Sequence, residues 1–134
     1  GSREMAGLVN QVLESQDPLP QAKPLSFDGS SIQAEPVDRV ILATRHHDDE
    51  EAVALAEQLY TKNIPFVALS TIHDADRQGI ESKADVHIDL KVKRGLIPAD
   101  DGSRSGYPSL MAALFVIHII QNTLSELLDE LGFE

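Results

Sequence analysis

The sequence predicts an α/β domain with a doubly wound parallel sheet, on three adjacent observations. A β-branched apolar run covers Arg39–Thr44, an Ala- and Leu-rich helical pattern covers Glu50–Lys62, and a second apolar run covers Phe66–Ser70. A strand, helix and strand of these lengths form a parallel crossover, which is almost always right-handed. The chain of 134 residues, 42% of them hydrophobic, is long enough for one domain over 1–134 with its own core.

The helical pattern inside the crossover has one apolar face. Apolar residues recur there at the three- and four-residue spacing of an α-helix, at Ala52, Leu55, Ala56 and Leu59. Asn63 follows the helix and suits the left-handed conformation that stops it. We therefore expect this face to pack on the sheet.

Further elements are expected outside the crossover. They are a helix over Arg3–Leu13, an edge strand over Ala22–Phe27, a strand over Ala84–Val92, a loop over Gly95–Gly106 and a helix from Pro108 to about Leu131. Pro24 confines its strand to a sheet edge because proline lacks an N–H donor. Pro108 suits the first turn of the last helix.

Composition excludes several classes of protein. The net charge of −11 repels nucleic acid and anionic membranes, so neither is expected as a partner. With no cysteine, the chain has no disulfide, thiolate metal site or Cys nucleophile, and a cytoplasmic location is favoured. The longest apolar run, Leu110–Ile120, is shorter than the ~20 residues of a membrane helix, so we expect a buried helix. Because this run is apolar all round, we also expect a homodimer through the last helix.

Ligands of doubly wound sheets bind beyond the carboxyl ends of the strands. The loops Thr44–Asp49 and Ser70–Asp76 qualify here, together with the start of the chain. The first loop continues into the helix as His46-His47-Asp48-Asp49-Glu50-Glu51. Three interpretations are open: acid–base catalysis by a histidine, a zinc or manganese site, or a helix start capped by Asp48 with Glu51 in a capping box.

Two other groups are weaker candidates. Ser70 and Thr71 could hold a ligand hydroxyl or phosphate, or could only shape a turn. Ser103 and Arg104 lie in the glycine-rich loop before the last helix, where Arg104 could clamp a phosphate or pair with a local acid. His87 and His118 are expected to be structural.

The order of elements resembles the sugar-isomerase (SIS) domain. Ser82-Lys-Ala-Asp-Val-His-Ile-Asp89 is similar to a strand near the end of that domain. Asp101-Gly-Ser-Arg-Ser-Gly-Tyr-Pro-Ser-Leu-Met-Ala-Ala-Leu114 resembles a small uncharacterised bacterial branch, often labelled phosphoheptose isomerases. The resemblance extends over most of the chain.

The resemblance implies a five-stranded sheet of flavodoxin-like order, a homodimer and a phosphosugar or related anionic ligand. It also implies residues upstream of Gly1, because the N-terminal helix and central strand of the family are missing here. Phosphate would lie at Gly1–Arg3 and at Thr44–Asp49. The implied ligand-binding residues are Ser2, Arg3, Thr44, Arg45, Ser70, Thr71, Ser103 and Arg104.

For an aldose–ketose isomerase, His46 or His47 would carry the proton and Glu50 would assist; we expect no metal and no cofactor. One departure affects the ligand. Four acids follow His47 where the family has a Ser/Thr loop, and they would repel a phosphate from that helix start. The alternative function is therefore a non-catalytic ligand-sensing or assembly module with the same fold.

Overall fold

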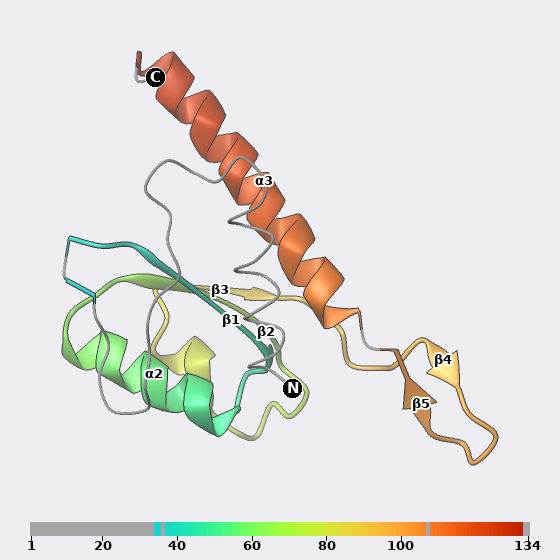
Figure 1. Ribbon diagram of the computed structural model, residues 1–134. Coiled ribbons are helices and arrows are strands. Elements are labelled where there is room, and N and C mark those ends of the chain that lie inside the picture. Colours follow the sequence, from blue (N-terminus) through green and yellow to red (C-terminus); the bar gives the residue numbers. More distant parts are fainter. Residues whose placement is uncertain (1–33, 36, 107, 133–134) are drawn as a thin grey trace.

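The protein is described by a computed structural model over residues 34–35, 37–106 and 108–132. A parallel three-stranded sheet in the order β1-β2-β3 forms its centre (Figure 1). The elements are β1 (Val40–His46), α2 (Glu50–Thr61), β2 (Phe66–Thr71), the 3-10 turn η1 (Ile80–Ser82), β3 (Val86–Asp89), β4 (Ile97–Pro98), β5 (Arg104–Ser105) and α3 (Ser109–Glu130). The expected elements over 3–13 and 22–27, together with Ser2 and Arg3, lie outside the described residues.

The predicted crossover is confirmed. β1 and β2 pair in parallel from Val40 opposite Phe66 to His46 opposite Thr71, and α2 connects them. Asn63 has the left-handed φ of 58° that ends the helix. Ala52, Ala56 and Leu59 of α2 are buried, as their spacing predicts.

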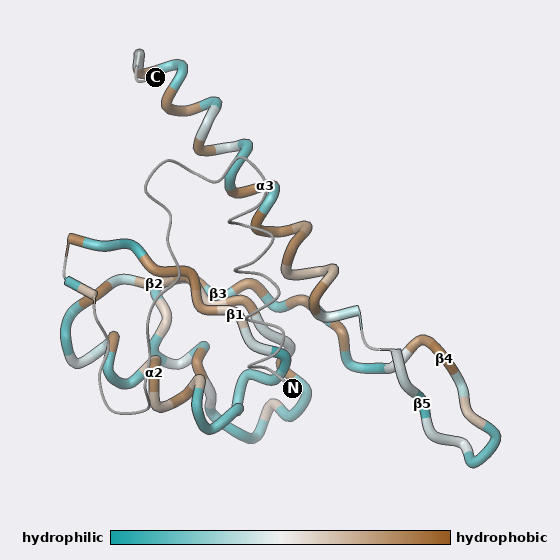
Figure 2. The backbone as a smooth tube through the Cα atoms, in the orientation of Figure 1, coloured by the Kyte–Doolittle hydropathy of each residue, from teal (hydrophilic) through white to brown (hydrophobic). Residues whose placement is uncertain are grey.

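The two long helices cover opposite faces of the sheet. The core on the α2 face contains residues of α2, alternate residues of β1 and β2, one residue of the loop before β2 and one of η1: Leu42, Ala52, Ala56, Leu59, Ile64, Phe66, Ala68 and Ile80. On the other face, Leu69 packs with Ile117 of α3. Figure 2 shows the apolar strands lying between these helices. The described part of the protein is thus a mixed α/β layer structure, as expected.

Two elements differ from the sequence expectation. The strand expected over Ala84–Val92 is only Val86–Asp89: Asp85 precedes it with its carboxylate on the backbone N–H of Phe66, and Lys91 follows it with a left-handed φ of 61° that interrupts the extended backbone. The expected loop Gly95–Gly106 contains the antiparallel hairpin β4–β5, which projects away from the sheet in Figure 1. Gly102, with a φ of +83°, makes its turn.

The helix α3 contacts the sheet with a narrow stripe. Ser109, Ala113 and Ile117 are buried, whereas Met111 and Phe115 are 73% and 66% exposed. The expectation of a buried helix over Leu110–Ile120 therefore holds only for this stripe. By length and composition alone the 22-residue helix could cross a membrane, a criterion that core helices of soluble proteins also meet.

Candidate functional site

Polar side chains are buried where β1 and β2 end. Thr44, His47, Ser70 and Thr71 are all at most 1% exposed. The ladder is irregular between Ala43 and His46, and the His47 N–H then donates to the Thr71 carbonyl over 3.2 Å. This irregularity turns the His47 side chain into the protein. We call this end of the sheet, with the loops that follow β1 and β2, the carboxyl-end site.

His47 is fully buried and pairs with Glu81. Its Nδ1 lies 3.0 Å from Oε2 of Glu81, and the other Glu81 oxygen accepts from the Gly79 N–H over 2.9 Å. Burial alone raises the pKa of Glu81, but the N–H groups of Glu81 and Gly79 and the His47 bond outweigh it and lower that pKa. A carboxylate can only accept, so Nδ1 of His47 is the donor in this bond. Nε2 of His47 is buried and has no hydrogen-bond partner within the described residues.

Gly79 allows η1 to lie directly against His47. A Cβ at Gly79 would stand 1.9 Å from the His47 carbonyl oxygen, so no larger residue fits without backbone movement. The same carbonyl accepts from the Ile80 N–H over 2.8 Å. Ile80 is itself fully buried in the core. The core thus anchors the turn that supplies Glu81.

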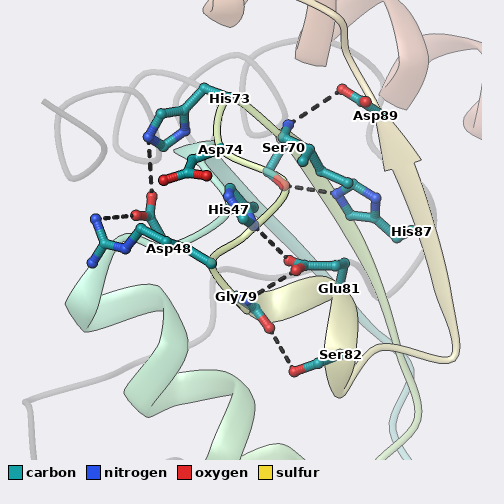
Figure 3. Close-up of polar contacts among 12 residues, drawn as sticks. His47, Asp48, Ser70, His73, Asp74, Gly79, Glu81, Ser82, His87 and Asp89 are labelled. Atoms are coloured by element: carbon teal, nitrogen blue, oxygen red, sulfur yellow. Dashed lines mark hydrogen bonds and ion pairs between the residues drawn. The ribbon is translucent and has the colours of Figure 1, made fainter.

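Asp48 and His73 stand on the other side of the His47 ring (Figure 3). The Asp48 carboxylate has one oxygen 3.5 Å from Nε2 of His73 and the other 2.7 Å from the Arg77 guanidinium. His47, Asp48 and His73 each offer a donor atom, and these atoms lie within 4.8 Å of one another. The three side chains come from the loops that follow β1 and β2.

His46 is exposed at the last position of β1. Its ring meets the His73 ring edge-on, with 4.6 Å between the centroids. Burial lowers the pKa of His46, and the neighbouring His73 lowers it too, whereas Asp48 raises it. The balance favours the neutral imidazole, which can accept a proton.

Comparison with known proteins identifies the family at this point. A family model described as a domain of unknown function, DUF2529, matches residues 1–128. The chain belongs to the DUF2529 family. A relative from Bacillus subtilis (strain 168), the uncharacterized protein YwjG, is 38% identical over 130 residues, which cover 97% of this chain and 73% of the relative.

The expected membership of the SIS family is therefore wrong, because the family whose model matches the chain is DUF2529. The resemblance depended on the order strand, polar loop, helix and strand, which many parallel α/β proteins share. The Asp101–Leu114 segment contains the hairpin turn, β5 and the start of α3, none of which specifies sugar chemistry.

Several predicted site residues of the DUF2529 protein meet at the carboxyl-end site. Thr44, His46, His47, Ser70 and Thr71 all lie there, on β1, β2 or directly after them. Arg45 lies within the irregular part of β1. The Ser70 hydroxyl is 2.7 Å from Nε2 of His87, so a histidine expected to be structural extends the site to β3 (Figure 3).

The helix start differs in detail from the expectation. Asp49, and not Asp48, caps α2 by accepting from the Ala52 N–H over 3.1 Å. Asp48 is thereby left for His73 and Arg77. Glu50 is exposed in the first turn of α2, and the carboxylate that meets His47 is Glu81.

Ser103 and Arg104 lie on the β4–β5 hairpin, away from the carboxyl-end site (Figure 1). The Arg104 guanidinium donates to the carbonyls of Gly95 and Leu96, at 2.7 and 3.1 Å. The Ser103 hydroxyl donates to Asp101 over 2.6 Å. Both side chains stabilise the hairpin.

Sequence reasoning did not single out Glu81 or Gly79, and it included His73 only as a member of the loop Ser70–Asp76. Glu81 and His47 are 34 positions apart, and no local pattern joins them. A signal did exist for His73, because it follows the strand next to β1 and loops after neighbouring parallel strands meet at one edge.

Proposed function

We propose that the protein binds a small, hydroxylated, anionic molecule of the sugar-phosphate class at the carboxyl-end site, and that His46 moves a proton on it. The corresponding reaction is an aldose–ketose isomerisation. The observation that carries this proposal is the exposed His46 imidazole, held edge-on to His73 at the end of a parallel sheet where ligands usually bind.

Accessibility favours His46 over His47 as the proton carrier. A general base must come within hydrogen-bond reach of the proton that it removes. His47 is 0% exposed and its Nδ1 is engaged with Glu81, so a sugar cannot reach it while the loops stay in place. His46 is open to solvent and has the neutral form favoured by its surroundings.

The doubly wound, flavodoxin-like sheet is part of the proposal. Its support is the parallel order β1-β2-β3 with α2 and α3 on opposite faces, which matches the last three strands of such a sheet. We also propose a cytoplasmic homodimer through α3. Its support is the row of exposed apolar side chains on α3, including Met111, Phe115 and Ile119.

Thermal unfolding with a panel of sugar phosphates tests the ligand. A ligand at ~100 times its dissociation constant adds ~2.7 kcal/mol of stability, which is a clear rise in Tm. Turnover of the sugars that bind is then followed by NMR. His46→Gln should abolish turnover and leave binding measurable, whereas His118→Gln, a matched change on exposed α3, should change neither.

Three outcomes separate the hypotheses. Binding with turnover that depends on His46 supports the isomerase. Binding without turnover supports the non-catalytic sensing module instead. No rise in Tm with any sugar phosphate overturns the proposed ligand class.

A further inference from the structure

We propose that His47, Asp48 and His73 form a binding site for a divalent first-row transition-metal ion, with zinc as the ion to test. We call these residues the His-Asp-His site. The inference concerns the ion alone and does not depend on which small molecule the protein binds.

The donor atoms are already gathered. One nitrogen of His47, one of His73 and one oxygen of Asp48 lie within 4.8 Å of one another. Bonds of about 2.0–2.2 Å to zinc place donors about 3.4 Å apart in a tetrahedral site. The His73 side chain is partly exposed on a loop, so a rotation that brings it inward can close the remaining gap.

His47 supplies an observation that points to a ligand. Its ring is 0% exposed, Nδ1 is paired with Glu81, and Nε2 has no partner within the described residues. A buried polar atom without a hydrogen-bond partner has lost its contact with water and gained nothing in exchange, so such atoms are rare without a function. With Nδ1 paired to Glu81, Nε2 is the ring nitrogen left for an ion, and it lies toward the side where Asp48 and His73 stand (Figure 3).

The surroundings match the outer shell of a metal site. Histidine ligands usually donate their second ring N–H to a carboxylate, which fixes the ring and raises its basicity. Glu81 is in that position, and the Gly79 N–H holds it there. Arg77 occupies one oxygen of Asp48 and leaves the other facing His73.

The chemistry of the donors selects the ion. Two imidazoles and one carboxylate suit zinc and its first-row neighbours better than calcium or magnesium, which prefer oxygen ligands. Three protein ligands leave at least one position for water or a bound molecule, which is the pattern of a reactive metal site.

A purely structural role for His47, Asp48 and His73 explains fewer of the observed contacts than a bound ion does. An ion pair between His73 and Asp48 would explain those two residues, whose separation of 3.5 Å is at the limit of a hydrogen bond. It would leave Nε2 of His47 unexplained. A bound ion accounts for all three residues and for Glu81.

The ion would also bear on the proposed ligand, and this step rests on the proposed function. Asp48, Asp49, Glu50 and Glu51 concentrate negative charge beside the site, within a chain of net charge −11. A divalent ion at the His-Asp-His site would offset part of that negative charge. The ion would also offer an open coordination position to a phosphate or sugar oxygen.

Metal titration of the whole chain tests the inference. The protein is stripped with a chelator and dialysed, and zinc binding is measured by calorimetry and by elemental analysis of the dialysed complex. We expect one zinc ion per chain. Cobalt should bind at the same stoichiometry and give the visible spectrum of a site with nitrogen and oxygen ligands.

Variants assign the ligands. His73→Ala and Asp48→Asn each remove one proposed zinc ligand. Each should weaken zinc binding by about 10–100-fold or more. Glu81→Gln should weaken it by a factor in that range while leaving one ion per chain, because Glu81 positions His47 without touching the ion. The matched control is His118→Ala, a histidine on α3 outside the His-Asp-His site, which should leave the affinity and stoichiometry of zinc binding unchanged.

The zinc titration is carried out without sugar, so a failure of the metal site can be told apart from a failure of the sugar-phosphate screen. Absence of stoichiometric zinc overturns the inference, and so does binding that His73→Ala and Asp48→Asn leave unchanged. Zinc binding that persists when no sugar phosphate binds supports the His-Asp-His site and removes only the proposed ligand.

Discussion

Replacing Gly79 by alanine should destabilise the protein more than any change at an exposed turn. The new Cβ would stand 1.9 Å from the His47 carbonyl oxygen and 2.4 Å from its carbon, both backbone atoms. Because neither can rotate away, η1 must move off His47. The movement breaks the 2.8 Å bond from the Ile80 N–H to that carbonyl and displaces Glu81 from His47.

The magnitude follows from these two losses. Forcing a group into packed structure costs about 1–3 kcal/mol, and one lost backbone hydrogen bond costs about 0.5–1.5 kcal/mol. The sum is a destabilisation of about 2–4 kcal/mol. Urea unfolding measures it, and with a slope near ~2 kcal/mol per molar the midpoint should fall by about 1–2 M.

Gly102→Ala is the matched control. Gly102 has a φ of +83°, and no atom of the described residues lies within 4 Å of the place where its Cβ would stand. Alanine there costs only the left-handed strain of about 1–2 kcal/mol. If Gly79→Ala proves no more destabilising than Gly102→Ala, the close contact between η1 and His47 is not what holds the site together.

Three further predictions concern other parts of the molecule. Asp49→Ala should cost about 1 kcal/mol in urea unfolding because it removes the cap of α2, and an unchanged midpoint would contradict that role. The pKa of Asp89 is below its ordinary value: burial raises it, but the Lys91 amide and ammonium and the Ile72 amide outweigh burial. Ionised Asp89 therefore stabilises the fold above its unfolded pKa, and this contribution is lost as the pH falls through its folded pKa. The difference in free energy of unfolding between the wild type and Asp89→Asn should accordingly shrink in acid. A difference that stays constant with pH would refute this. Phe115→Glu should convert the proposed dimer to a monomer in size-exclusion chromatography with light scattering, and a wild type that is already monomeric at micromolar concentration would refute the dimer.

The sequence was sufficient for the crossover because hydrophobic spacing is a local property. Ala52, Ala56 and Leu59 recur at helical spacing, and Asn63 marks the helix stop. The apolar runs on either side match β1 and β2 to within two residues. The same reasoning placed His46 and His47 at the carboxyl end of β1, since ligand sites of parallel sheets follow from strand direction.

The sequence was less informative where neighbours in space decide the outcome. The apolar run of α3 predicted burial, but the sheet covers only its Ala113 and Ile117 stripe. Arg104 looked available for an anion, yet the hairpin uses its guanidinium for the carbonyls of Gly95 and Leu96. The SIS resemblance followed the order of elements, which this chain shares with many other α/β proteins.

The loop after β1 shows most clearly which features the sequence determined and which the tertiary structure decided. The sequence by itself determined that histidines and acids follow a buried strand and begin a helix. Only the tertiary structure decided their roles, since it turns His47 inward against Glu81, leaves His46 exposed, caps α2 with Asp49 and frees Asp48 to face His73. The physical reason is that the partners of His47 and Asp48 come from residues 73 to 81, which the parallel pairing of β1 with β2 brings to the same edge.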